Sequence, residues 1–227
     1  MMFKTIYEYE DFAQSTTNED GSRVYVNASG VAYPSATTVL SVLSKDSIKE
    51  WRQRVGEEEA NRISSTAATR GTKIHTLVEK YLGNEEITSE TYEEQKVDPF
   101  NAQLFEDYKK FLNRINNIHA QELALYSDHL RMAGRVDCIA EFEGKLAIID
   151  FKTSRKLKRK DWIESYFLQA TAYSIMYEER TGIPVPNLVI GIAVDHESEP
   201  QIFLEKRDNW VKKLLNTRDY FESGRFF

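Results

Sequence analysis

The sequence contains very little cysteine. Cys138 is the only one among 227 residues, so the chain cannot form an internal disulfide, a four-cysteine iron–sulfur cluster or a structural zinc site built on several cysteines. Long apolar runs are also missing, because the longest, at 188–194, is far below the roughly 18 residues that a membrane helix needs. The first ten residues show no apolar stretch of the signal-peptide kind. We therefore expect no iron–sulfur cluster, no membrane partner and a cytoplasmic location.

The sequence has neither an excess of positive charge nor a phosphate-binding loop. Its 30 Lys and Arg residues stand against 36 Asp and Glu residues, which gives a formal net charge of −6. Such a chain is not expected to coat nucleic acid nonspecifically, although a local basic site is compatible with it. No G-x-x-x-x-G-K-[ST] motif occurs, so we expect the protein to act without ATP.

The most informative stretch is 134–154, GRVDCIAEFEGKLAIIDFKTS. It predicts two short strands joined by a turn at Glu143-Gly144-Lys145, where glycine supplies the positive φ of a tight hairpin. Side chains alternate between the faces of a strand, so Asp150 and Lys152 share one face of an otherwise apolar strand. Burying two charged groups there is costly unless they find partners, which indicates chemistry at this strand.

Asp137 lies in the first strand of this hairpin, where it can be brought opposite the Asp150 end of the second. Two carboxylates on neighbouring strands form an oxygen-rich site that suits Mg²⁺ or Mn²⁺. A nearby ammonium such as Lys152 offsets the second carboxylate, can hold an attacking water and can stabilise charge on a phosphate. Asp137, Asp150 and Lys152 are therefore candidate catalytic residues for metal-assisted hydrolysis of a phosphodiester.

The rest of the chain predicts an α/β fold, an α+β sandwich with a mixed β-sheet flanked by helices. We expect a single domain over 1–227, with an N-terminal hairpin and helical region at 1–120 and the catalytic sheet with its flanking helices at 121–227. The acidic segment 84–97 is expected to be an exposed loop. The expected strands are 23–26, 31–33, 122–126, the two strands of 134–154, 188–195 and 201–205. Helices are expected at 36–44, 57–82 and 161–180. Three more are expected: one capped by Asp46, one that starts at Asp98-Pro99 and runs past Ile115 and Ile118, and one capped by Asp208.

Two pairs of polar residues lie four positions apart on expected helices. His75 and Glu79 sit beside the apolar stripe of helix 57–82, and this spacing also fits a boundary histidine hydrogen-bonded to its i+4 glutamate. Glu79 can equally be a solvated partner of Lys80. Gln169 and Tyr173 share one face of helix 161–180, where they can point together at a site, although a tyrosine on so apolar a helix can simply pack.

Several of these residues resemble the motifs of a known family. Gly134-Arg135-Val136-Asp137 and Ile149-Asp150-Phe151-Lys152-Thr153 resemble the G-x-x-D…(D/E)-x-K core of the PD-(D/E)xK nuclease superfamily, in particular its RecB-like exonuclease branch. Arg70-Gly71-Thr72-Lys73-Ile74-His75 with Glu79 resembles the upstream histidine motif of that branch, and Gln169 with Tyr173 resembles its downstream Q-x-x-x-Y. The opening at 34–40 is similar to that of mitochondrial and phage-encoded exonucleases within the branch. Four motifs in order are far more specific than a D-x-K triplet alone.

The resemblance implies a restriction-endonuclease-like core and a role for each matched residue. The implied metal ligands are His75, Asp137, Asp150 and the backbone carbonyl of Phe151, around Mg²⁺ or Mn²⁺. The implied substrate contacts are Arg70, Gln169 and Tyr173. Lys152 would position or activate water, and Glu79 would orient the imidazole of His75 or complete its hydrogen-bond network.

Residues that follow the second hairpin strand offer further contacts to a nucleic-acid backbone. Thr153 and Ser154 carry hydroxyl groups that can meet a phosphate, although they equally suit an ordinary turn. Arg155 and Lys156 open a basic run that extends to Lys160 in an acidic chain, at the place where a scissile backbone would approach. A solvated charged face is the alternative for this run.

The main functional hypothesis is a Mg²⁺- or Mn²⁺-dependent deoxyribonuclease, an exonuclease that acts on single-stranded DNA or on free ends. The resemblance would place such an enzyme in DNA replication or recombination, in the host cytoplasm if a phage encodes it. One alternative is a structure- or sequence-specific endonuclease of the same superfamily. The other is a noncatalytic nucleic-acid-binding module, which the presence of Asp137, Asp150 and Lys152 together disfavours.

Overall fold

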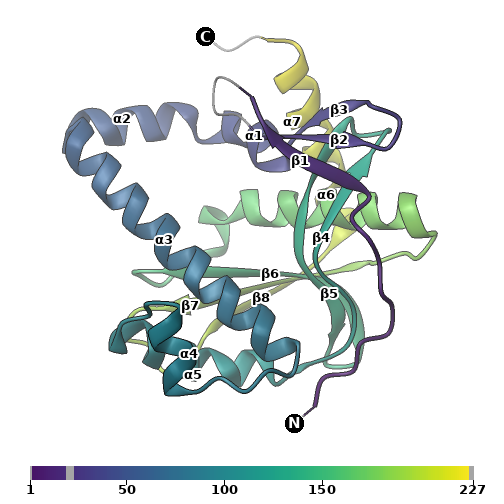
Figure 1. Cartoon of the computed structure of the whole chain (residues 1–227). Coiled ribbons are helices and arrows are strands. Elements are labelled where there is room, and N and C mark those ends of the chain that lie inside the picture. The colour runs from purple at the N-terminus through teal and green to yellow at the C-terminus, as the bar shows by residue number, and fades with distance from the viewer. Residues whose placement is uncertain (1, 19–22, 225–227) are drawn as a thin grey trace.

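The computed structural model describes residues 2–18 and 23–224. Their centre is a five-stranded sheet made of β4 (Ile115–Ser127), β5 (Met132–Phe142), β6 (Lys145–Ser154), β7 (Asn187–Val194) and β8 (Gln201–Lys206), in that order (Figure 1). β6 and β7 are parallel, and the other neighbours are antiparallel. α6 (Glu164–Thr181) provides the crossover that a parallel pair requires. The expected mixed sheet flanked by helices is confirmed.

The alternation of side chains along β6 separates the core into two halves. Ile148 packs in a cluster with α6, α1 (Ala36–Leu40) and α7 (Val211–Glu222). Ile149 and Phe151 point the other way, into a cluster with α3 (Glu57–Leu82) and α5 (Pro99–Leu112). The sheet therefore lies between two helical layers that apolar burial holds in place. None of the helices described within 2–18 and 23–224 combines the length and the apolarity needed to cross a bilayer.

A second, three-stranded antiparallel sheet packs beside β4 and β5. It consists of β1 (Ala13–Thr17), β2 (Arg23–Asn27) and β3 (Ala32–Pro34). The expected hairpin of β2 and β3 is confirmed, and the Asn27 side chain closes its turn by accepting hydrogen bonds from the backbone N–H groups of Ser29 and Val31, at 3.0 and 2.9 Å. β1 was not expected from the sequence.

Several expected helix boundaries are confirmed. α3 covers the expected range, and Ser35 and Asp98 cap α1 and α5 through bonds of 3.0 Å to the backbone N–H groups of Thr38 and Asn101.

Other boundaries differ from the sequence prediction. α2 (Lys45–Val55) starts before Asp46, which lies in the first turn and is not the cap. The segment 84–97 contains α4 (Ser89–Glu94), so it is not simply a loop. Ile115 and Ile118 belong to β4, which begins well before 122, and α5 ends at Leu112. Asp208 lies in a 3₁₀ turn (Arg207–Asn209) ahead of α7, so it does not cap that helix.

Candidate active site

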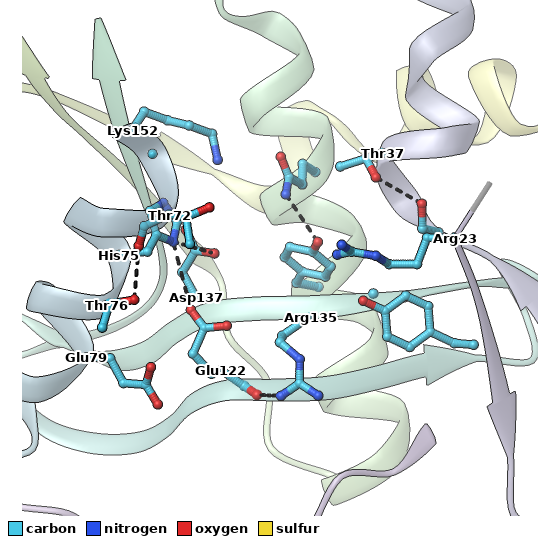
Figure 2. Close-up of a pocket in the computed structure, with 16 residues that line it drawn as sticks. Arg23, Thr37, Thr72, His75, Thr76, Glu79, Glu122, Arg135, Asp137 and Lys152 are labelled. Carbon is cyan, nitrogen blue, oxygen red and sulfur yellow. Dashed lines mark hydrogen bonds and ion pairs between the residues drawn. The ribbon is translucent and has the colours of Figure 1, made fainter. Parts of the chain in front are cut away.

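A cavity of about 430 Å³ opens between α3, the paired strands β4 and β5, and α6 (Figure 2). We call it the active-site cavity. The residues expected from the sequence that line it are His75, Glu79, Asp137, Lys152, Gln169 and Tyr173. Side chains that are up to 98 positions apart in the sequence, at 75 and 173, therefore meet in one space.

Asp137 is placed by the register of the central hairpin. Cys138 on β5 pairs with Ile149 on β6, so Asp137 comes beside the position of Asp150. One carboxylate oxygen of Asp137 accepts a hydrogen bond of 2.9 Å from the backbone N–H of Phe151, and the other lies 3.7 Å from Nδ1 of His75. The expected juxtaposition of Asp137 with the Asp150 end of β6 is present.

Asp150 and Lys152 form a buried ion pair at the end of β6. Asp150 is only 1% exposed, and its Oδ1 lies 2.7 Å from Nζ of Lys152. Burial raises the pKa of Asp150 to about 6, against the opposing attraction of the Lys152 ammonium. Burial also disfavours the charged form of Lys152, but Asp150 and Asp137 outweigh it and raise the pKa of the ammonium. Oδ2 of Asp150 is buried and has no hydrogen-bond partner among the described residues, which leaves one carboxylate oxygen available to a cation.

His75 connects α3 to β6. Its Nε2 donates a hydrogen bond of 2.8 Å to the carbonyl oxygen of Phe151, and its Nδ1 lies 3.9 Å from Glu122. Burial lowers the pKa of His75, but the hydrogen bond to Glu122 and the charge of Asp137 outweigh burial and raise it to about 9. The imidazole is therefore cationic at neutral pH when the carboxylates have no other cation.

The donor set fits a hard divalent cation. One ligand atom each from His75, Glu122 and Asp137 lies within 4.8 Å of the others. Nδ1 of His75 lies 3.9 Å from Glu122 and 3.7 Å from Asp137, whereas Nε2 is bonded to the Phe151 carbonyl at 2.8 Å, so the two ring nitrogens face different members of this set. The two carboxylates of this group suit Mg²⁺, and its nitrogen ligand suits Mn²⁺; the Phe151 carbonyl and the unpartnered oxygen of Asp150 lie on the neighbouring strand β6.

Glu122 is the cavity carboxylate that the sequence reasoning missed. Gln121 pairs with Cys138 and Leu123 pairs with Val136, so Glu122 lies across from Asp137 on the neighbouring strand. The sequence predicted a strand that starts at Glu122, but its register against β5 was not predictable. Arg23, Tyr25, Thr37 and Arg135 also line the cavity and were not proposed as functional residues (Figure 2).

Glu79 faces the cavity from α3, one turn after His75 (Figure 2). Burial raises its pKa, and the like charge of Glu122 raises it further. The alternative partner, Lys80, is instead paired with Glu85 at 2.6 Å. Glu79 therefore adds negative charge at the rim of the donor set, and Lys80 does not neutralise it.

Gln169 and Tyr173 form one wall of the cavity. Gln169 Nε2 donates a hydrogen bond of 3.1 Å to the Tyr173 hydroxyl, and Tyr173 is also packed in the core, so this tyrosine both lines the cavity and contributes to the core. Gly134 is required opposite this ring, because a Cβ there would lie 2.7 Å from Cε1 of Tyr173. The glycine of the G-x-x-D motif thus makes room for the tyrosine of the Q-x-x-x-Y motif.

The other expected substrate contacts lie away from this cavity. Thr153 does not line it, nor do Arg70, Ser154, Arg155 and Lys156. Arg70 is paired with Asp195. Ser154 has the turn role, because its hydroxyl donates to the carbonyl of Lys156 at 2.6 Å and accepts from the N–H of the same residue at 3.2 Å.

Comparison with known proteins agrees with this geometry. The profile of the PD-(D/E)XK nuclease superfamily matches residues 49–202. The chain is 28% identical to the human protein named mitochondrial genome maintenance exonuclease 1, over 85% of this chain and 59% of that protein. The protein of the same name from Mus musculus is 25% identical, over 97% of this chain and 68% of that protein. The one from Xenopus tropicalis is 27% identical, over 76% of this chain and 52% of that protein. The chain thus spans roughly half to two thirds of the length of these relatives. Because the family profile covers more than half of the chain, this protein belongs to the PD-(D/E)XK nuclease superfamily.

Proposed function

We propose that this protein is a metal-dependent DNA exonuclease that acts on single-stranded DNA or on free ends. The observation that carries the proposal is that His75, Asp137 and Lys152 line one cavity, while Asp150 is paired with Lys152 and the N–H and carbonyl of Phe151 are bonded to Asp137 and His75. Membership in a nuclease superfamily gives the reaction class, and the curated relatives are named as exonucleases.

The residues that would hold Mg²⁺ or Mn²⁺ are His75, Glu122, Asp137, Asp150 and the carbonyl of Phe151. Such an ion would polarise the phosphodiester and favour deprotonation of a water. Asp137 would be held in place by the N–H of Phe151, and Asp150 would fix the position of the Lys152 ammonium. Because the pKa of Lys152 is raised, it would act as a positive charge that orients water and stabilises the transition state, not as a base.

The size and lining of the active-site cavity favour an unpaired strand. A volume of about 430 Å³ is that of a small-ligand pocket and is enough for one nucleotide. Arg23 supplies a cation across the cavity from the carboxylates, where a phosphate backbone would lie, whereas Arg135 is paired with Asp11 and donates to the carbonyl of Glu122.

The test uses linear single-stranded DNA labelled at either end and covalently closed single-stranded circles, with Mg²⁺ or Mn²⁺. We expect linear DNA to shorten progressively while circles remain intact. Asp150→Asn and Lys152→Ala should each lower the rate by about 100-fold or more. Lys145→Ala is the matched control, because Lys145 is an exposed cation at the opposite end of β6.

Each alternative has its own signature in the same assay. Discrete products from circles would assign an endonuclease. DNA binding without cleavage under either metal would assign a noncatalytic module. Normal rates in both Asp150→Asn and Lys152→Ala would disprove the proposed active site. The label that is released first gives the polarity of digestion.

A further inference from the structure

A second cavity of about 430 Å³ adjoins the active-site cavity along α3. We call it the side cavity. On α3, Gly71 and Thr72 line the active-site cavity, whereas Thr69 and Lys73 line the side cavity. The same division holds at the end of β6, since Lys152 lines the first cavity and Arg155, directly after the strand, lines the second. Three residues of extended chain span roughly 10 Å, so one strand of nucleic acid can reach both.

Two acidic residues, Asp98 and Asp195, are among the described residues that line the side cavity, and both already have bonding partners. Asp195 is paired with Arg70, and both side chains are largely buried. Asp98 is the N-cap of α5 and accepts the backbone N–H of Asn101 at 3.0 Å. These partners weaken the repulsion between each carboxylate and a bound anion. Lys73 and Arg155 then give the cavity its positive charge.

Arg155 is the available cation. It is exposed, and it makes no hydrogen bond or ion pair with the residues that the structure describes. Lys73, by contrast, donates to the carbonyl of Lys96. A guanidinium without a hydrogen-bond partner among the described residues, beside the hydroxyl groups of Ser65 and Thr69, is suited to a phosphate, whereas the Thr66 hydroxyl already donates to the Arg62 carbonyl.

Phe100 adds an aromatic surface to the same cavity. It is 43% exposed, although it stands in the first turn of α5, next to a well-packed core. The guanidinium of Arg70 lies 6.0 Å from its ring centroid, and the ring of His196 lies at 5.3 Å. The ring is therefore held in place while a large part of its surface faces solvent, which is the arrangement on which an unpaired base stacks.

We propose that the side cavity is a subsite for an unpaired nucleotide of the DNA strand, whose base stacks on Phe100 and whose phosphate is bound by Arg155. The proposal rests on the proposed nuclease function and extends it to a second cavity, which Arg70 and Lys73 of the histidine motif also line. It makes Phe100 and Arg155 substrate-binding residues that fix the strand beside the reacting phosphate.

The experiment measures the affinity for a single-stranded oligonucleotide by fluorescence anisotropy in the presence of EDTA, so that cleavage does not interfere. Phe100→Ala and Phe100→Leu should both weaken binding roughly 5- to 100-fold, and Phe100→Trp should retain it. Phe100→Leu keeps an apolar side chain at this position, so a loss of affinity in this variant reports on stacking and not on folding. Arg155→Ala should make the dependence of log affinity on log salt shallower by about 0.7, while Lys145→Ala should not.

A single 2-aminopurine placed at successive positions of the oligonucleotide locates the subsite. One position should be quenched by the wild type and by Phe100→Trp, but not by Phe100→Leu. Unchanged affinity of Phe100→Leu together with an unchanged salt slope of Arg155→Ala would overturn the subsite. Because binding is measured without cleavage, an intact subsite in a protein that cuts no DNA would instead disprove the proposed function alone.

Discussion

Replacing Gly134 with alanine would measure how tightly the wall of the active-site cavity is packed. A Cβ atom at this position would lie 2.7 Å from Cε1 and 2.9 Å from the hydroxyl of Tyr173. Tyr173 is only 3% exposed and accepts a hydrogen bond from Gln169, so its ring cannot swing freely into solvent. The new methyl group must therefore displace the ring or the backbone of β5.

Overpacking of this kind costs about 1–3 kcal/mol. In a chain of 227 residues, each kcal/mol changes Tm by about 2–4 °C, so calorimetry should show a decrease of about 2–12 °C. Gly71→Ala is the matched control, because a Cβ there would meet no described atom within 4 Å beyond its chain neighbours and the backbone of its own helix. Alanine is favoured over glycine inside a helix by about 1 kcal/mol, so the Tm of this variant should rise by about 2–4 °C.

A second substitution separates the ring from the strand. Tyr173→Leu in the Gly134→Ala background removes the ring that the methyl group meets, so the double variant should lose less stability than the two single changes added together. A wild-type Tm for Gly134→Ala would refute the packing argument. Strict additivity in the double variant would show that the cost does not arise from this contact.

Three other perturbations follow from the charges and caps described above. Glu122→Gln should weaken Mn²⁺ binding about 10- to 100-fold in isothermal titration, and an unchanged affinity would remove Glu122 from the donor set. The pKa of His75 is raised to about 9 in the metal-free protein. The stability that its charge contributes should therefore be complete below about pH 6.5 and lost as the pH rises through 9. Urea unfolding should show that loss in wild type and not in His75→Gln, and equal slopes in both would contradict it. Asp98→Ala removes the cap of α5 and should lower the free energy of unfolding by about 1 kcal/mol, whereas Asp98→Asn should retain most of it.

The features that could be predicted from sequence are those set by local rules. Phe142 pairs with Lys145, so the hairpin turn has two residues, and Glu143 and Gly144 both have positive φ as that turn requires. The period of two then places Asp150 and Lys152 on one face. α3 was predictable for a similar reason, because an apolar stripe ends at Gly83, which caps the helix.

The early start of β4 could not be predicted, because a shift in the strand register spaces its buried residues as they would be in a helix. The register of β4 against β5 shifts between Asn116 and Ala120, and Asn117 has a positive φ. The shift turns both Ile115 and Ile118 inward although they are three residues apart. A spacing of three between buried residues is the signature of a helix, so the pattern extended α5 too far.

α4 was missed because it has no apolar stripe to reveal it. It is short, none of its residues is buried, and a capping box of Thr88 and Thr91 holds its first turn. Its contact with the core comes through Tyr92, which donates to Glu106 on α5 and packs against Phe105. Both partners belong to α5, outside the segment 84–97. The composition of that segment alone therefore indicated an exposed loop.

The candidate site residues could be proposed from the sequence by type, but their partners depend on tertiary contacts. Without a divalent ion, His75 donates to the Phe151 carbonyl, Asp137 accepts the Phe151 N–H, and Lys152 holds one oxygen of Asp150. The charged imidazole thus occupies the electrostatic place that a metal ion would take between the carboxylates. Coordination requires the neutral imidazole, so metal and proton compete for His75. The charged imidazole and the Lys152 ammonium therefore offset the cost of collecting these carboxylates in the metal-free protein.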